Sequence, residues 1–225
     1  MLLAIDTSTS QMGLALVDEG QILAEFTWKG NLMHTVELAP TVQEIFQKTG
    51  IEAKNLNGLG VATGPGSFTS LRVGLSFIKG LAFSLGIPVA GINSLLVQAC
   101  AVTPHEDLPL MCTLPAGRGR HACNTFSYSA RKKWHPNTEP HISTAQEIAD
   151  TITEQILFCG ELSNEERSVL KHNEKITLLD AVFCTRRPAL LGWLAEKQIK
   201  KGEADDLFSL APSYLHIGPP IAAEQ

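Results

Sequence analysis

The order of apolar segments in the first hundred residues is the feature that most constrains the fold. Three short strand-like segments come first, and helix-length amphipathic segments then alternate with short apolar strands. The predicted order is strand, strand, strand, helix, strand, helix, strand, helix. The expected strands cover residues 2–5, 13–17, 22–28, 59–62 and 87–90, and the expected helices cover 35–49, 67–85 and 94–102.

Two residues bear on where these helices begin. Pro40 lies inside the first helix and should kink it or move its start later. Ser67 stands at the N-cap position of the second helix, which ends at Gly86. The second helix is apolar around more than half of its circumference, so we expect it to be covered on two sides, either within its own lobe or by another chain.

The second half of the chain is less regular. Residues 103–109 predict a linker, because two prolines flank a polar stretch. We therefore expect a first lobe over residues 1–103 and a smaller, degenerate second lobe over 104–225, with the C-terminal segment a candidate to pack back on the first. The second lobe should contain strands at 110–114, 122–128, 156–159 and 176–179, and helices at 144–149, 164–170 and 188–199.

Charge and cysteine content exclude several classes of protein. The 18 basic and 23 acidic residues give a net charge of -5, and the basic residues form no long run, whereas a dedicated nucleic-acid binder usually carries a basic stripe. If RNA is the ultimate substrate, we expect a partner to hold most of it. The five cysteines are widely spaced and contain no CxxC pair, which favours reduced, mostly buried thiols.

The same composition bears on location. The apolar run 2–5 is too short for a signal sequence, and no other stretch is expected to reach the roughly 18 apolar residues that a membrane span needs. We expect a cytoplasmic protein without a membrane partner.

The first candidate site follows the first strand. Asp6, Thr7 and Ser8 begin a run of one carboxylate and four hydroxyl groups where the strand ends. Such a loop can hold a metal-bound phosphate through the carboxylate and the loop amides. A turn rich in Ser and Thr is more often only a turn, so both interpretations stay open.

The second candidate site lies between a strand and the apolar helix. Gly64 and Gly66 let the backbone turn tightly, and Ser67 follows at the start of the helix. The first amides of a helix can face an anion, which would make this turn a second phosphate loop. A tight turn with Ser67 as a helix cap explains the same residues.

Together, the element order, the Asp6 loop and the Gly64 turn resemble the first lobe of the actin, sugar-kinase and Hsp70 superfamily. This resemblance implies a two-lobed α/β fold of the ribonuclease H-like type, with mixed sheets flanked by helices. Four further segments are similar to the TsaB (YeaZ) family, a relative of the transferase TsaD. They are Leu3-Ala4-Ile5-Asp6-Thr7-Ser8, His34-Thr35-Val36-Glu37-Leu38-Ala39-Pro40, residues 64–75 with Lys79-Gly80-Leu81-Ala82, and Ala211-Pro212-Ser213-Tyr214-Leu215.

The resemblance implies an accessory protein of tRNA threonylcarbamoyladenosine synthesis, at position 37 of the tRNA, that pairs with TsaD through helices of the first lobe. The ATPase TsaE and a second copy of the chain are further candidate partners, and tRNA would be contacted only indirectly. The Asp6 and Gly64 loops would be remnants of phosphate loops. The partner surface implied by position consists of His34, Glu37, Leu38, Thr41, Leu71, Arg72, Leu75, Phe77 and Ile78.

Three features favour a partner protein over an enzyme. Pro115 stands where the second lobe should open with a carboxylate-bearing loop, and residues 115–122 depart from the family's Asp-Ala-Arg-Arg-Gly-Glu-Val-Tyr motif. No two of the 18 glycines are adjacent, although enzymes of this fold use such a pair near the adenine. No two of the seven histidines have the helical spacing that the TsaD metal site needs.

We therefore expect no catalytic residue, no metal and no cofactor of the chain's own, with weak or shared nucleotide binding at a subunit junction left open. An active ATP-dependent transferase or kinase of the same fold is the first alternative. A peptidase is the second, and it lacks a metal pair or a clear nucleophile in the sequence.

Overall fold

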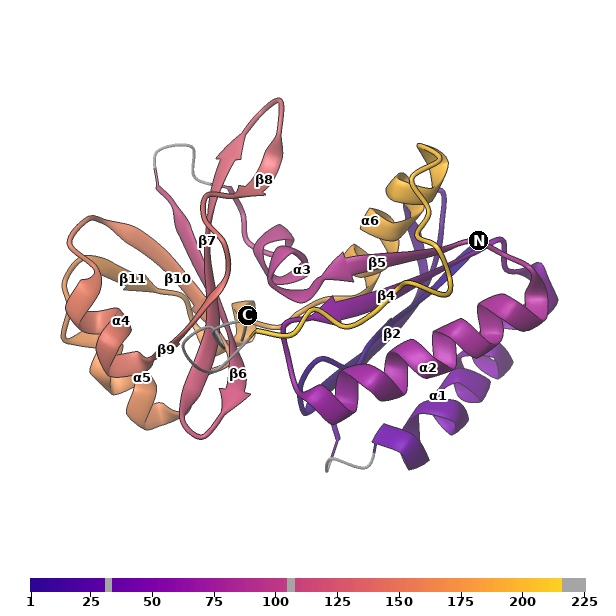
Figure 1. The fold of residues 1–225 in the computed structure, drawn as a ribbon, viewed down its shortest axis with the longest axis horizontal. Coiled ribbons are helices and arrows are strands. Elements are labelled where there is room, and N and C mark those ends of the chain that lie inside the picture. Colours follow the sequence, from indigo (N-terminus) through magenta and orange to yellow (C-terminus); the bar gives the residue numbers. More distant parts are fainter. Residues whose placement is uncertain (31–33, 105–107, 216–225) are drawn as a thin grey trace, which may run out of the picture.

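A computed structural model of the protein describes residues 1–30, 34–104 and 108–215. The chain forms two β-sheets, and each sheet has helices packed against it (Figure 1). We call the sheet of β1–β5 with its helices the first lobe, and the sheet of β6–β11 with its helices the second lobe. Residues 105–107 of the expected linker lie outside the described residues.

The first sheet combines an antiparallel meander with two parallel strands, in the order β3-β2-β1-β4-β5. β1 pairs antiparallel with β2 and parallel with β4. It is the central strand and is buried along its length, so Asp6 at its end is brought into the interior. The strands are β1 (Leu2–Asp6), β2 (Gln11–Asp18), β3 (Gln21–Lys29), β4 (Gly58–Gly64) and β5 (Val89–Asn93).

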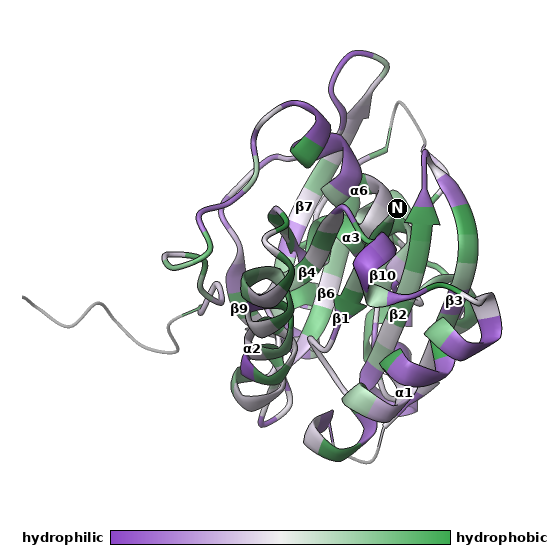
Figure 2. Cartoon of the chain, turned by 90° about the vertical axis from the view of Figure 1, so that its right-hand side faces the viewer, coloured by the Kyte–Doolittle hydropathy of each residue, from purple (hydrophilic) through white to green (hydrophobic). Residues whose placement is uncertain are grey.

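Alternation along β1 divides the core of the first lobe between the two faces of the sheet. Leu3 and Ile5 belong to the core beneath α1 and α2, whereas Leu2 and Ala4 pack with Ala195 of α6. Figure 2 shows these central strands as largely apolar, while α1 also carries polar residues. The helices of this lobe are α1 (His34–Thr49), α2 (Phe68–Leu85) and α6 (Pro188–Lys200).

Because α6 follows the second sheet in the chain yet packs on the first, the two lobes are not two consecutive segments. The chain crosses from the second lobe back to the first just before Pro188, and this crossing carries Arg186 between them. α3 (Ser94–Cys100) also joins the lobes, since its Leu95 and Ala99 lie in the core of the second sheet. The side chain of Asn93 caps α3 by accepting hydrogen bonds from two backbone N–H groups.

The second sheet has the strand order β11-β10-β6-β7-β8, and β9 pairs with the other part of β7. Its helices α4 and α5 begin with capping boxes at Thr144 and Ser163. Short 3-10 turns lie at 53–55 and 181–183. The elements are β6 (Leu110–Gly117), β7 (Arg120–Ser129), β8 (Lys133–Pro136), β9 (His141–Thr144), α4 (Ala145–Thr151), β10 (Ile156–Gly160), α5 (Asn164–Lys171) and β11 (Ile176–Leu178).

Every predicted strand and helix is observed with small shifts at its ends, but some local details differ. β8 and β9 were not expected, because each has four residues and little apolar alternation. α1 already begins at His34 and continues through Pro40, so the proline does not move its start. Ser67 occupies the N-cap position of α2, yet its side chain makes no capping hydrogen bond.

The expectation that no apolar stretch is long enough to cross a membrane is wrong for α2. Among the described residues it is the one helix that passes this test by length and composition, with a mean hydropathy of 1.2 over 18 residues. A single such helix is weak evidence, because core helices pass the same test. α2 packs against β1, β4 and β5, which accounts for its buried residues, whereas Phe68 and Phe83 are exposed.

The same packing corrects the partner surface that the sequence implied. Five of its nine residues are buried in the first lobe itself, so they offer little area to a partner, although Leu38 still lines a groove between α1 and α2. These residues are His34, Leu38, Leu71, Leu75 and Ile78.

Replacing Leu75 with Ala should lower the free energy of unfolding by about 2–5 kcal/mol, because it leaves a cavity between α2 and the sheet. The neighbouring residue Ser76 is exposed, and Ser76→Ala should change stability by less than about 0.5 kcal/mol. Urea denaturation of both variants measures the difference. Equal stability of the two variants would contradict the packing of Leu75 in the core.

Candidate functional site

Asp6 lies at the meeting point of the two lobes, and both of its carboxylate oxygens are used within the chain. Oδ1 accepts a hydrogen bond from the backbone N–H of Ser8 at 2.8 Å. Oδ2 accepts one from Nε of Arg186 at 2.7 Å, although the two residues are 180 positions apart in the sequence. Asp6 is therefore a buried ion-pair partner rather than a free ligand.

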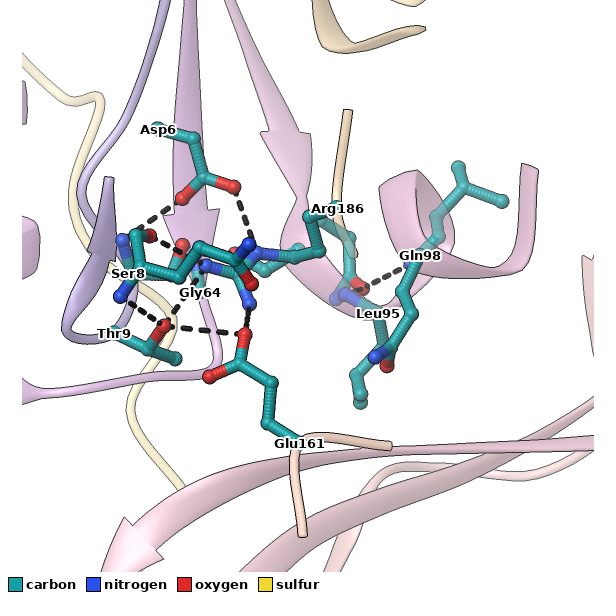
Figure 3. A network of polar contacts seen from close by, with 12 residues as sticks. Asp6, Ser8, Thr9, Gly64, Leu95, Gln98, Glu161 and Arg186 are labelled. Atoms are coloured by element: carbon teal, nitrogen blue, oxygen red, sulfur yellow. Dashed lines mark hydrogen bonds and ion pairs between the residues drawn. The ribbon is translucent and has the colours of Figure 1, made fainter. Parts of the chain in front are cut away.

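Arg186 connects this carboxylate to a second one in the other lobe (Figure 3). Its guanidinium contacts Glu161, which follows β10, and it donates hydrogen bonds to Oγ1 of Thr9 and to the carbonyl of Gln11, each at 3.0 Å. Oγ1 of Thr9 also donates to Glu161 at 3.2 Å. We call Asp6, Thr9, Glu161 and Arg186 the Arg186 cluster.

The charge on Arg186 is maintained although only 2% of the residue is exposed. Burial disfavours the charged form, but the carboxylates of Asp6 and Glu161 outweigh this effect and raise the pKa of the guanidinium above its ordinary value. The cluster thus holds one permanent positive charge between two carboxylate groups. Both carboxylate oxygens of Asp6 and Oε1 of Glu161 are engaged by these contacts.

The Gly64 turn packs directly against the Asp6 loop. The backbone N–H of Ser67, at the start of α2, donates to the carbonyl of Ser8 at 2.7 Å. A Cβ at Gly66 would lie 2.2 Å from that carbonyl oxygen, so only glycine fits there. Oγ of Ser94 lies 2.6 Å from Oγ of Ser8 and accepts from the N–H of Gly64 at 3.1 Å. The remaining loop residue, Thr7, donates its hydroxyl to the carbonyl of Ser70 at 2.7 Å.

These contacts test whether the two loops fit a metal-bound phosphate, the group that ATP-binding relatives of this fold hold between their lobes. The Asp6 carboxylate is neutralised by Arg186, and the N–H of Ser67 is donated to Ser8 rather than outward. The structure therefore brings Asp6, Thr7, Ser8, Gly64, Gly66 and Ser67 together as expected of neighbouring loops, but their polar groups bind each other. These loop residues therefore do not fit a metal-bound phosphate.

The cavity beside these loops is also unsuited to phosphate. It has a volume of about 670 Å³ and lies between the loops at Thr9 and Gly66 and the β6–β7 hairpin. None of its lining residues is charged, whereas a nucleotide phosphate needs opposing positive charge. Pro115 and Gly117 line the cavity from the second lobe. Residues 115–122, which differ from the family's motif, form the β6–β7 hairpin and supply no carboxylate to the cavity.

The cysteines are poorly suited to nucleophilic chemistry. Burial raises the pKa of Cys100 to about 11 and that of Cys123 to about 12. A hydrogen bond with Cys112 raises the pKa of Cys159, and a hydrogen bond with Cys159 together with burial raises that of Cys184. A thiol is nucleophilic as the thiolate, which these shifts suppress at neutral pH. In residues 1–30, 34–104 and 108–215 no three His, Cys, Asp or Glu side chains are placed to hold a metal, and His105 and His216 lie outside these ranges.

The sequence-derived partner residues fall into two groups. His34 is buried, and its ring nitrogens contact the carbonyl of Thr9 at 3.0 Å and Oγ of Ser70 at 3.5 Å, so it braces α1 against the Asp6 loop. The other buried residues belong to the core. The accessible or partly accessible residues are Glu37, Thr41, Arg72 and Phe77.

A groove of about 600 Å³ separates α1 from α2 on the outside of the first lobe. We call it the α1–α2 groove, and it is lined by Thr35, Leu38, Ala39, Phe68, Thr69, Arg72, Val73, Ser76 and Phe77. At one end Arg72 donates to the hydroxyl of Tyr214 at 2.9 Å and lies over the ring of Phe68. The C-terminal motif that the sequence singled out therefore borders this groove.

The sequence analysis did not identify Arg186, which pairs with the Asp6 carboxylate, or Glu161, which contacts the same guanidinium. Neither belongs to a recognisable motif, and no local pattern joins them to Asp6. An arginine beside a carboxylate-bearing loop is visible only once the chain is folded.

Replacing Arg186 with Met should destabilise the protein by roughly 3–5 kcal/mol, because the buried carboxylate of Asp6 and the partly buried one of Glu161 lose their counter-charge. The adjacent Arg187 is half-exposed and pairs with Glu25, so Arg187→Met should cost at most about 1 kcal/mol. Thermal unfolding of both variants at pH 7 measures the difference, and equal stability of the two would contradict the buried ion pair between Arg186 and Asp6.

Comparisons with known proteins identify the family. Residues 22–156 match the family model of TsaD, tRNA N6-adenosine threonylcarbamoyltransferase. The TsaB protein of Bacillus subtilis (strain 168), named for tRNA threonylcarbamoyladenosine biosynthesis, is 28% identical over 220 residues, which cover 96% of this chain and 94% of that protein. The TsaB protein of Escherichia coli (strain K12) is 36% identical over 98 residues, or 44% of this chain and 42% of that protein.

Solved structures agree on the fold. YeaZ from Pseudomonas aeruginosa superposes with a TM-score of 0.77 at 21% identity, covering 95% of this chain and 99% of that one. The ROK hexokinase from Thermus thermophilus gives 0.51 at 9% identity, with 88% and 99% covered, which places the chain in the two-lobed class that includes actin and the sugar kinases. The chain belongs to the TsaB (YeaZ) family of tRNA threonylcarbamoyladenosine biosynthesis proteins, whose relative is the transferase TsaD.

Proposed function

We propose that this chain is a non-catalytic partner subunit in the modification of tRNA to N6-threonylcarbamoyladenosine at position 37, and that it pairs with and activates the transferase TsaD in the cytoplasm. The observation that carries the non-catalytic part is the Arg186 cluster. A phosphate-handling enzyme of this fold needs the Asp6 carboxylate free for a metal ion. Here that carboxylate is paired with a buried arginine.

The two alternatives are disfavoured by different observations. An active ATP-dependent transferase or kinase would need charge from both lobes around the phosphates, but the cavity between the lobes has no charged lining residue. A cysteine peptidase would need an activated thiol, but burial and hydrogen bonding raise the pKa of Cys100, Cys123, Cys159 and Cys184. Nucleotide shared at a junction with another subunit would have to rely on residues of that subunit.

The α1–α2 groove is the surface that we propose for the transferase. It carries exposed apolar groups beside polar ones: Phe68 is 51% exposed, and Thr69 and Ser76 are exposed near it. The transferase is the proposed occupant because its family model matches residues 22–156 of this chain, a range that includes α1 and α2. The two proteins would then carry related lobes, and related helices of these lobes could pack against each other. A second copy of the chain would compete for the same surface, and TsaE would bind the assembled pair.

The contribution to the reaction is then architectural. Because α1 is tied to the Asp6 loop through His34, and that loop is tied to the second lobe through Arg186, the groove is presented on a rigid support. A rigid surface can hold the transferase in its active geometry at little cost in conformational entropy.

Ser76→Arg should abolish co-elution with the transferase from the same cell and the stimulation of tRNA modification, because a long charged side chain would fill the centre of the α1–α2 groove. Its unfolding free energy should stay within about 0.5 kcal/mol of the wild type. The matched control is Ser168→Arg on α5, which is equally exposed but lies in the second lobe, and it should co-elute normally. Normal pairing of the Ser76 variant would exclude this surface.

The wild-type chain alone should hydrolyse no ATP and modify no tRNA, and the transferase should be active only when both are mixed. Size-exclusion chromatography and a modification assay on purified components measure both points. ATP turnover or tRNA modification by the chain alone would overturn the non-catalytic assignment.

A further inference from the structure

A second large groove lies on the other side of the first sheet, between α6 and the β7–β8 hairpin, with α3 at its floor (Figure 1). Its volume is about 710 Å³. It differs from the cavity beside Asp6 because five cationic side chains line it. We call it the basic groove and define it by Lys132, Lys133, Arg187, Lys197 and Lys201.

The charge of the basic groove opposes that of the whole chain. Among the described residues, its lining includes five basic and no acidic side chains, while the net charge of the protein is -5. The cations come from three segments of the chain: the turn before β8 with the first residue of that strand, the residue before α6, and the last turn of α6 with the residue that follows it. Their concentration in one place is a product of folding.

Glu25 neutralises one of the five cations of the basic groove, whereas Glu196 is engaged outside it. Glu25 pairs with Arg187 and also accepts from the N–H of Ala189. Glu196 accepts from two backbone N–H groups and pairs with Lys200. Among the described residues, no carboxylate lies within ion-pair distance of Lys132, Lys133, Lys197 or Lys201.

Aromatic rings alternate with these cations. Nζ of Lys197 lies 3.5 Å from the ring centroid of Trp193, and Nζ of Lys133 lies 5.9 Å from that of Tyr128. Tyr128 packs edge-on against the buried ring of Trp134, with centroids 5.5 Å apart. Trp193 and Tyr128 are only partly buried, so they present ring surface to the groove.

Cations beside aromatic rings over an apolar floor form a surface suited to nucleic acid with unstacked bases. The lysines meet the phosphates, and the rings accept the bases. A lipid surface is flat and fits a concave groove poorly, and a small anion would leave most of the 710 Å³ unfilled. The apolar floor consists of Leu96, Cys100, Val102, Ala189, Leu190 and Leu194.

We infer that the basic groove binds RNA directly, through the phosphates and bases of a single-stranded or loop region of the tRNA that the assembly modifies. The identity of this RNA rests on the proposed function, whereas the binding of a polyanion with accessible bases rests on the groove itself. The inference differs from the expectation that tRNA is contacted only through a partner, and the experiment below decides between them.

Two double variants test the inference, Lys132→Glu with Lys133→Glu and Lys197→Glu with Lys201→Glu. The matched control is Lys171→Glu with Lys175→Glu, which changes the net charge equally on exposed residues of the second lobe. Fluorescence anisotropy with labelled tRNA over a salt series is measured for the pure chain and for its mixture with the transferase. Circular dichroism establishes that every variant is folded.

Each groove variant should bind tRNA at least about tenfold more weakly than the control variant, and the slope of log K against log salt should fall by about 1 for each lysine that contacts a phosphate. Trp193→Ala should weaken binding by about 5- to 150-fold with an unchanged salt slope, because stacking and not charge is lost. Trp193→Phe should recover most of the affinity.

Wild-type affinity in the groove variants, or an equal loss in the control variant, would overturn the inference. Loss of co-elution with the transferase at unchanged tRNA binding would instead assign the groove to an acidic protein surface, and that result would also overturn it. Co-elution of the wild-type chain with the transferase tests the proposed function independently, so the two can fail separately.

Discussion

The ion pair between Arg186 and Asp6 is the interaction on which the arrangement of the two lobes depends. Asp6 ends the central strand of the first sheet, Glu161 follows a strand of the second, and the guanidinium bridges them while it also binds Thr9. A buried arginine between two carboxylates is stable only as a complete set, because removing one member leaves an uncompensated charge. The packing of α6 on the first sheet holds the arginine in place, so the bridge and the fold support each other.

This bridge and the N–H of Ser8 engage both carboxylate oxygens of Asp6, so that carboxylate is not free for a metal-bound phosphate. The loops at Asp6 and Gly64 lie side by side, and their amides and hydroxyls bind each other. Under the proposed function, what the chain contributes to the reaction lies on its outer surfaces, which are the α1–α2 groove and the basic groove.

Local patterns in the sequence predicted the elements well, because hydrophobic periodicity and the glycine and capping residues act over short distances. The apolar run of β1 and the apolar spacing in α2 belong to this class. The ion pair of Asp6 could not be predicted, since its partner is 180 residues away and no pattern connects the two. Leu75 was placed on a partner surface by the family resemblance, and the apolar pattern of α2 shows that a residue is covered but not by what. The basic groove was missed because its lysines come from separate segments of an acidic chain.

The two surfaces lie on opposite faces of the first sheet, since α1 and α2 cover one face and α6 covers the other. A transferase in the α1–α2 groove would therefore leave the basic groove free, and one chain could contact protein and RNA at the same time. An overall negative charge suits this arrangement, because it weakens non-specific binding of nucleic acid elsewhere on the surface while the local positive charge directs RNA to one side. The transferase and the RNA would then each bind to a small part of the surface. The connection through Arg186 would fix the distance between the α1–α2 groove and the basic groove.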